Sequence, residues 1–206
     1  MKLKFSLLPG LLAVAMGFSG AAMAGVTDAT GDWASNYTAA KTNDLDVVSS
    51  FVSYDPATHM FTVSGTMLGS IVSGGTARYI WGFDRGSATN APFAVAPGVK
   101  FDTTVSLNAD GTGTVAGAAL AGGTVMINGT TISASFSDSL LAPTTSGVSY
   151  GGYTWNLWPR FANQIPDFAP DNAMAAVDVV PEPGTWAMMA LGLGGLVLLA
   201  RRRRQA

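Results

Sequence analysis

Apolar and polar residues alternate along several short stretches of this chain, which is the pattern of β-strands with one buried face. The clearest stretch covers residues 99–107, where polar residues occupy every even-numbered position. The odd-numbered positions hold Val99, Phe101, Thr103, Val105 and Leu107. This pattern predicts a strand over 99–107 whose odd-numbered side chains all share one face.

Two other stretches carry large apolar side chains at every second position. The first set is Tyr79, Trp81 and Phe83, and the second is Tyr153, Trp155 and Leu157. Each set predicts a strand with a strongly apolar face, and aromatic residues of this kind are enriched in strands.

Turn sequences separate the predicted strands. Asp55-Pro56 lies between the apolar stretches 51–54 and 60–64 and favours a type I turn. Asn128-Gly129 lies between Ile127 and Thr130 and is a strong signal for a two-residue hairpin. Short strands with turns at this spacing are typical of an all-β fold. We expect a single antiparallel β-sandwich over residues 25–178, of the jelly-roll or immunoglobulin-like kind.

The first 24 residues have the pattern of a secretory signal peptide. Lys2 and Lys4 precede an apolar stretch over 5–18, and Ala22-Met23-Ala24 supplies the small residues of a cleavage site. We therefore expect residues 1–24 to form a signal helix that signal peptidase removes, so that the exported chain begins at Gly25.

The other end of the chain, residues 179–206, combines three features in a fixed order. Pro181-Glu182-Pro183 comes first, and its prolines hold the backbone extended. An apolar stretch over 186–200 follows, which is short for a membrane span of roughly 20 residues. Arg201, Arg202, Arg203 and Arg204 come last, and clustered arginines beside a span stay on the cytoplasmic side. These features predict a short C-terminal transmembrane helix, and one interpretation is an ordinary C-terminal anchor.

The same three-part tail resembles the PEP-CTERM sorting signal of Gram-negative bacteria. The resemblance implies that exosortase, a membrane protease, recognises Pro181, Glu182 and Pro183. It also implies that the arginine cluster fixes the topology and that the membrane insertion is transient, because processing removes the tail.

Composition and charge change once both targeting segments are set aside. Residues 25–178 contain twelve aspartates but only five basic residues, which gives a net charge of −7. An acidic domain of this kind is not expected to bind nucleic acid. The chain has no cysteine, so the domain has neither disulfides nor thiol chemistry and depends on its core for stability.

The start of the domain shows a weaker similarity to extracellular β-sandwich modules of the DOMON and family-9 carbohydrate-binding groups. The residues concerned are an Asp-x-x-x-Asp at 28–32, an Asp-Leu-Asp-Val at 44–47 and the hairpin that follows. The similarity implies a sandwich fold and is compatible with a ligand, but fold alone does not assign a function.

Catalysis is not expected from this sequence. His59 is the single histidine, and no Gly-x-Ser-x-Gly motif accompanies it. A pair of facing carboxylates could hydrolyse a glycoside, but glutamate is absent from residues 25–178. We therefore predict that the protein is not an enzyme.

Aspartates cluster in two loop regions that could hold a cation. Asp28, Asp32, Asp44 and Asp46 are the better calcium candidates, and Asp167 and Asp171 lie in a second loop. The alternative interpretation is that these are ordinary turn aspartates. Zinc is not expected without cysteine. No cofactor is therefore expected apart from a structural calcium ion.

Aromatic and polar residues in the stretch 150–160 suggest a second ligand. Trp158, Trp155 and Arg160 are the candidate residues, because aromatic faces beside polar groups suit sugar rings. Trp155 shares its face with Tyr153 and Leu157, which favours a core position. Trp158 lies on the opposite face, so we expect it to be the exposed ring.

Together these observations predict an exported, non-enzymatic protein. We expect it to pass through the inner membrane of a Gram-negative bacterium and to reach the cell surface or the extracellular matrix, where it has a structural or interaction role. The alternative is a carbohydrate- or calcium-binding module of the biofilm matrix, with extracellular polysaccharide as its partner.

Overall fold

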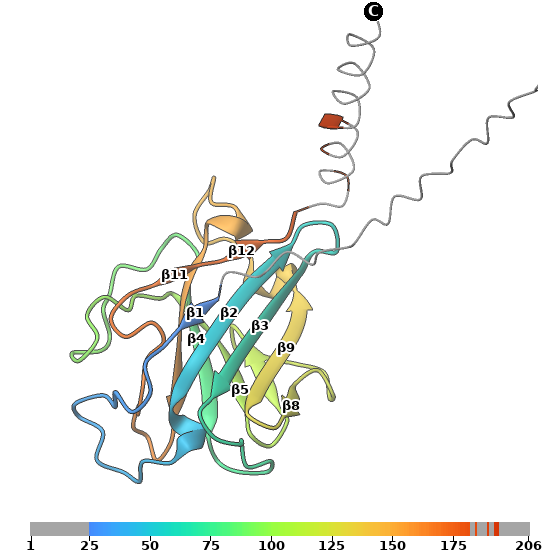
Figure 1. The fold of residues 1–206 in the computed structure, drawn as a ribbon. Helices are drawn as coiled ribbons and strands as arrows, with labels where there is room; N and C mark the ends of the chain where they lie inside the picture. The colour runs from blue at the N-terminus through green and yellow to red at the C-terminus, as the bar shows by residue number, and fades with distance from the viewer. Residues whose placement is uncertain (1–24, 182–183, 185–188, 190–191, 194–206) are drawn as a thin grey trace, which may run out of the picture.

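Two six-stranded β-sheets pack face to face in the computed structural model, which describes residues 25–181, 184, 189, 192 and 193 (Figure 1). The first sheet has the order β1-β2-β3-β9-β8, and β12 also pairs with β2. Its strands are β1 (Val26–Thr27), β2 (Val47–Asp55), β3 (Met60–Met67), β8 (Met126–Asn128), β9 (Thr131–Ser137) and β12 (Asp178–Val179).

The second sheet has the order β11-β10-β4-β5-β6-β7. Its strands are β4 (Arg78–Asp84), β5 (Thr103–Asn108), β6 (Gly113–Val115), β7 (Ala118–Ala119), β10 (Thr154–Arg160) and β11 (Ala175–Ala176). All strand pairs are antiparallel except β12 with β2, which are parallel. The predicted all-β class is therefore confirmed. Three short 3₁₀ helices complete the fold: η1 (Asn43–Leu45), η2 (Asp138–Leu141) and η3 (Tyr150–Gly152).

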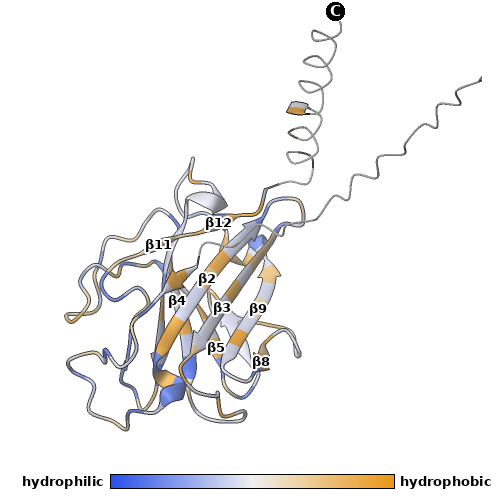
Figure 2. Cartoon of the chain, viewed as in Figure 1, coloured by the Kyte–Doolittle hydropathy of each residue, from blue (hydrophilic) through white to orange (hydrophobic). Residues whose placement is uncertain are grey.

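Both hairpins that the turn sequences predicted are present. In the turn between β2 and β3, the Asp55 carboxylate accepts hydrogen bonds from the Ala57 backbone N–H and the Thr58 hydroxyl. Between β8 and β9, Asn128 pairs with Thr131, and Gly129 takes a φ of 60° that glycine adopts without strain. Apolar and polar bands alternate along β2, β3 and β9, as expected for strands with one buried face (Figure 2).

The main core fills the space between the sheets. Tyr79, Trp81 and Phe83 of β4 are fully buried there, as their shared face predicted. Tyr153, just before β10, and Trp155 and Leu157 of β10 lie in the same core. The indole N–H of Trp81 donates to the Ser50 hydroxyl at 3.0 Å, which satisfies the polar atom of the ring inside an apolar interior.

A second, smaller core covers the outer face of the β4–β10 sheet. It consists of Ile80, Ala96, Val99, Trp158 and Phe168, with further apolar residues packed around them. The prediction of a strand over 99–107 is wrong in its first half, because β5 begins at Thr103. Val99 and Phe101 belong instead to a loop that folds over this outer face, whereas Val105 and Leu107 enter the main core.

The two predicted targeting segments lie largely outside the residues that the structure describes. The signal helix over 1–24 and most of the apolar stretch 186–200 are outside the described residues. Among the residues that are described, no helix is both long enough and apolar enough to cross a membrane.

Candidate functional site

Five aspartates from two distant parts of the chain meet at one edge of the molecule. Asp28 and Asp32 lie in the segment that follows β1, and Asp46 lies between η1 and β2. Asp167 and Asp171 come from the long connection between β10 and β11. The sequence placed these residues in two separate loops, and the fold joins the loops into one cluster.

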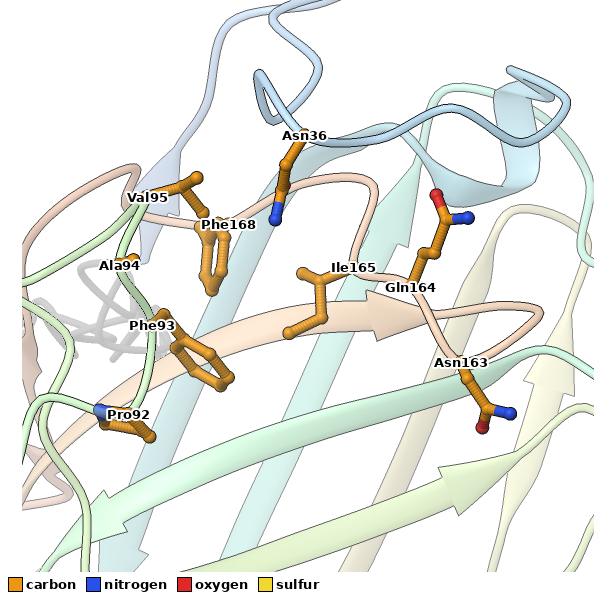
Figure 3. A pocket seen from close by; sticks show the side chains of 9 residues that line it. All are labelled: Asn36, Pro92, Phe93, Ala94, Val95, Asn163, Gln164, Ile165 and Phe168. Atoms are coloured by element: carbon orange, nitrogen blue, oxygen red, sulfur yellow. The ribbon is translucent and has the colours of Figure 1, made fainter.

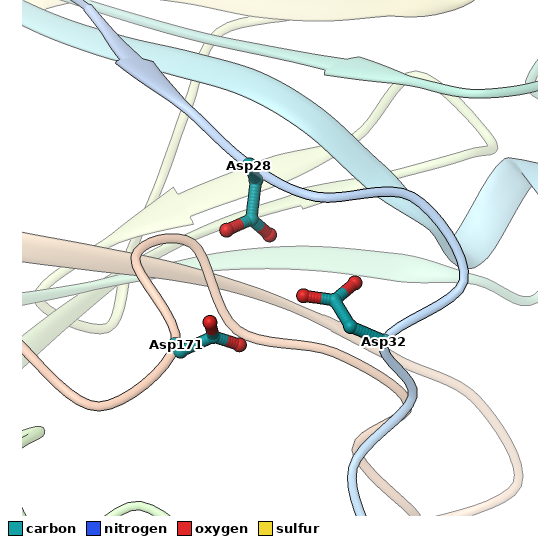
Figure 4. A group of neighbouring side chains, drawn as sticks. All are labelled: Asp28, Asp32 and Asp171. Carbon is teal, nitrogen blue, oxygen red and sulfur yellow. The ribbon is translucent and has the colours of Figure 1, made fainter.

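The cluster consists of two triads that share Asp32. The outer triad is Asp28, Asp32 and Asp171, and the inner triad is Asp32, Asp46 and Asp167. In each triad, one carboxylate oxygen per residue lies within 4.8 Å of the others. Figure 4 shows the three carboxylates of the outer triad pointing toward one another. Asp44, also predicted as a calcium candidate, belongs to neither triad. It lies inside η1, where its backbone carbonyl accepts the Tyr79 hydroxyl at 2.9 Å.

Backbone hydrogen bonds fix the two buried carboxylates of the inner triad. Asp46 is 2% exposed, and its Oδ2 accepts the Gly31 N–H at 2.8 Å. Asp167 is 1% exposed, and its two oxygens accept the N–H groups of Val47 and Phe168, each at 2.8 Å. These carboxylates are therefore held in place by the fold and are not free to turn outward.

Other oxygens of the cluster are buried without a hydrogen-bond donor. They are Asp28 Oδ2, both carboxylate oxygens of Asp32, and Asp46 Oδ1. The two ion pairs found among the described residues, His59–Asp138 and Arg85–Asp102, do not involve the cluster. The aspartates thus form a crowded acidic group that makes no ion pair with a basic side chain of the described structure.

The pKa values reflect this crowding. Burial, followed by repulsion from Asp32, Asp171 and Asp46, raises the pKa of Asp28 to about 7. Burial is also the main reason that the pKa of Asp167 rises to about 8, with Asp28 and Asp32 adding to it. The pKa values of Asp46 and Asp171 are raised as well, first by burial and then by the neighbouring Asp32. Burial, together with repulsion from neighbouring carboxylates, thus opposes ionisation of Asp28, Asp46, Asp167 and Asp171.

Two small hollows lie beside the cluster and share Val95 and Phe168. One, of about 180 Å³, is lined by Asp32, Asp167 and Asp171 together with Trp33. The other, of about 220 Å³, has an apolar floor that includes Phe93, Ile165 and Phe168 (Figure 3). The amide side chains on its rim are Asn36, Asn163 and Gln164.

The residues predicted to bind a sugar do not form one surface. Trp158 does point to the face opposite Trp155, but it is only 2% exposed, so the prediction of an exposed ring is wrong. Its indole packs against Phe93 and Phe101, each with ring centroids 5.0 Å away, because the loops over the outer face cover it. Trp155 is in the main core, as its pattern suggested, and Arg160 is exposed at the end of β10.

His59 takes part in a small network at the β2–β3 turn. Its Nδ1 lies 3.0 Å from Oδ2 of Asp138, and the same oxygen accepts the Tyr54 hydroxyl at 2.9 Å. The network links the turn to η2, and His59 itself has a φ of 57°. We interpret it as a structural contact that holds the turn.

The predicted sorting motif begins where the fold ends. The N–H of Val180 donates to the Tyr54 carbonyl of β2 at 2.9 Å, and Pro181 follows immediately. Glu182, Pro183 and Arg201–Arg204 lie outside the described residues.

One family model matches part of this chain. Residues 179–204 match the PEP-CTERM protein-sorting motif, which confirms the resemblance seen in the tail. No curated protein and no solved structure matches the chain. The motif implies export, transient anchoring in the membrane and processing by exosortase.

Proposed function

Because residues 179–204 carry a PEP-CTERM protein-sorting motif, we propose that this chain is a cell-surface protein of a Gram-negative bacterium. The tail holds the protein in the inner membrane until exosortase acts at Pro181-Glu182-Pro183, and the domain then passes to the surface or the extracellular matrix. The family match is the observation that carries this proposal. The position of the motif supports it, since Pro181 directly follows the last hydrogen bond of the fold, so the motif starts at the domain boundary.

The domain itself acts, in this proposal, as a non-enzymatic structural or interaction module. Its strand order supports a β-sandwich of the immunoglobulin-like kind. The neighbours β2-β3-β9-β8 and β11-β10-β4-β5-β6 follow the pairing of the two sheets of a variable-type immunoglobulin domain. Such sandwiches commonly serve as rigid surface modules, although the fold alone does not assign a partner.

The sorting role can be tested with Glu182→Ala. We expect the variant to accumulate at full length in the membrane fraction, because the residue between the two prolines is the charged element of the motif. Asp178→Asn is the matched control, since it removes one negative charge just before the motif and should be processed like the wild type. Immunoblotting of membrane and medium fractions distinguishes the two. Release of shortened Glu182→Ala into the medium would show that Glu182 is not needed for recognition.

A second candidate function is carbohydrate binding, and the amide-rimmed hollow is the observation that favours it. Amide groups above an apolar floor suit the hydroxyls and the apolar faces of a sugar. The test is cosedimentation of the processed protein with polysaccharide purified from the producing cells. Saturable binding that Asn163→Ala weakens would support this function, and unsaturable or absent binding would exclude it for that polysaccharide.

A further inference from the structure

We propose that Asp28, Asp32, Asp46, Asp167 and Asp171 form a calcium site that ties the N-terminal segment to the connection between β10 and β11. This site is independent of the sorting motif, because its residues lie in the domain and not in the tail. The convergence of the two triads on Asp32 defines its centre.

The buried side chain of Asp46 is the observation that separates this cluster from an ordinary acidic surface. Asp46 is 2% exposed, and its Oδ1 has no hydrogen-bond donor although Oδ2 is bound to the Gly31 N–H. A carboxylate oxygen of Asp46 lies within 4.8 Å of oxygens of Asp32 and Asp167. A buried carboxylate that faces other carboxylates is unfavourable in its ionised form unless a cation lies between them, and without a cation protons must relieve the repulsion.

The donor set selects the kind of ion. All candidate ligands are carboxylate oxygens, and the only histidine is engaged with Asp138 elsewhere. Hard oxygen donors suit calcium and magnesium and exclude zinc as the preferred metal. Calcium binds 6–8 oxygens at about 2.3–2.6 Å in flexible geometry, so oxygens on opposite sides of the ion are roughly 5 Å apart. Magnesium requires near-octahedral geometry at about 2.0–2.1 Å and retains water. Several carboxylates from irregular segments therefore suit the flexible coordination of calcium better than that of magnesium, which proteins usually hold with one or two carboxylates and water.

Four of the five ligands come from two segments with little regular secondary structure. Asp28 and Asp32 lie in a segment that, apart from the two-residue strand β1, has no regular secondary structure before η1. Asp167 and Asp171 belong to the connection whose Phe168 packs against Trp158 on the outer face of the sheet. In a chain without cysteine, an ion shared by these segments does the work that a disulfide does in many exported domains.

The experiment is thermal unfolding of the purified full-length chain in detergent, first in chelator and then with calcium chloride. We expect the Tm of the wild type to rise by about 5–10 °C when calcium is in roughly hundred-fold excess over its Kd. Asp32→Asn and Asp46→Asn should lose this rise. Asp44→Asn is the matched control, because it removes the same charge from the same region without altering either triad, and it should keep the full rise.

The design separates metal binding from a purely structural role of the aspartates. If the substitutions acted only through the fold, they would shift the Tm equally with and without calcium. A wild-type Tm that does not respond to calcium would overturn the proposal, as would loss of the response in Asp44→Asn. Magnesium chloride at the same concentration should give a smaller rise, and an equal or larger rise would overturn the assignment to calcium. Asp32→Asn should not affect processing of the tail. A negative result for the calcium site therefore leaves the sorting proposal intact, and a negative result with Glu182→Ala leaves the calcium proposal intact.

Discussion

At the scale of single residues, Gly82 shows how closely the second core is packed. A Cβ at this position of β4 would lie 2.6 Å from Cη2 of Trp158 and 2.9 Å from Cγ of Phe101. Both rings are held by their neighbours on the outer face of the sheet, so neither has room to move away. Glycine is therefore required here by the close approach of the indole.

The Gly82→Ala variant should accordingly be destabilised. We expect a loss of about 1–3 kcal/mol in the free energy of unfolding, which is typical of overpacking in a dense core. The measurement is urea unfolding followed by tryptophan fluorescence. Gly122→Ala is the control, because a Cβ at Gly122 would meet nothing within 4 Å, and its stability should change by less than about 0.5 kcal/mol. A Gly82→Ala chain as stable as the wild type would mean that Trp158 is not held as described.

Trp158 also illustrates what a sequence reveals about one residue. The period of two correctly placed it on the face opposite Tyr153, Trp155 and Leu157. Its burial depends on loops that are distant in sequence, among them the segment with Phe93 and Phe101. A strand pattern predicts which face of the sheet a side chain occupies but not whether another part of the chain covers that face. This is why the prediction of an exposed Trp158 ring was wrong.

At the scale of elements, local signals were sufficient for the hairpins and insufficient for the connections. Asp55-Pro56 and Asn128-Gly129 marked two turns correctly, because a turn is specified by the few residues that form it. The start of β5 could not be read in the same way. Val99 and Phe101 share the alternation of β5, yet they pack on the outer core before the chain enters the strand.

The connection between β10 and β11 is the element that decides the candidate site. Asn156 of β10 is fully buried and donates from Nδ2 to the carbonyls of Pro170 and Ala173, which holds this connection against the sheet. Asp167 is held in turn by the Val47 N–H at the start of β2. The sequence did show an Asp-x-x-x-Asp pattern at both 28–32 and 167–171, but only the tertiary fold brings the two patterns together.

At the scale of the whole molecule, the aspartate cluster should make the stability of the ion-free protein depend on pH. The pKa values of Asp28 and Asp167 are about 7 and about 8 in the folded state, compared with roughly 3.9 in an unfolded chain. Between these values the folded state holds more protons than the unfolded state, so its stability falls as the pH rises. The sign is opposite for Asp102 and Asp110, whose pKa values are lowered in the folded state. Their contribution to stability is fully present above roughly pH 4 and is lost only as the pH falls below that value, so it does not change between pH 5 and pH 8.

We therefore expect the Tm in chelator to be higher at pH 5 than at pH 8. Differential scanning calorimetry across this range gives the measurement. Asp28→Asn should flatten the dependence, because it removes one of the two aspartates whose pKa is raised most. Saturating calcium should reduce the difference, since the ion replaces the protons that relieve repulsion among the carboxylates. A Tm in chelator that rose from pH 5 to pH 8 would contradict this account of the cluster.

The parallel pairing of β12 with β2 has a mechanical consequence. β12 is paired only at Asp178 and Val179, whereas β2 is paired with β3 along its whole length. While the tail is anchored, a force between the cell and anything bound to the domain passes through this short strand. Such a force peels β12 away from β2 first and leaves the two facing sheets intact. In the proposed anchored state the protein would thus extend by a few residues under tension while its two facing sheets stay folded.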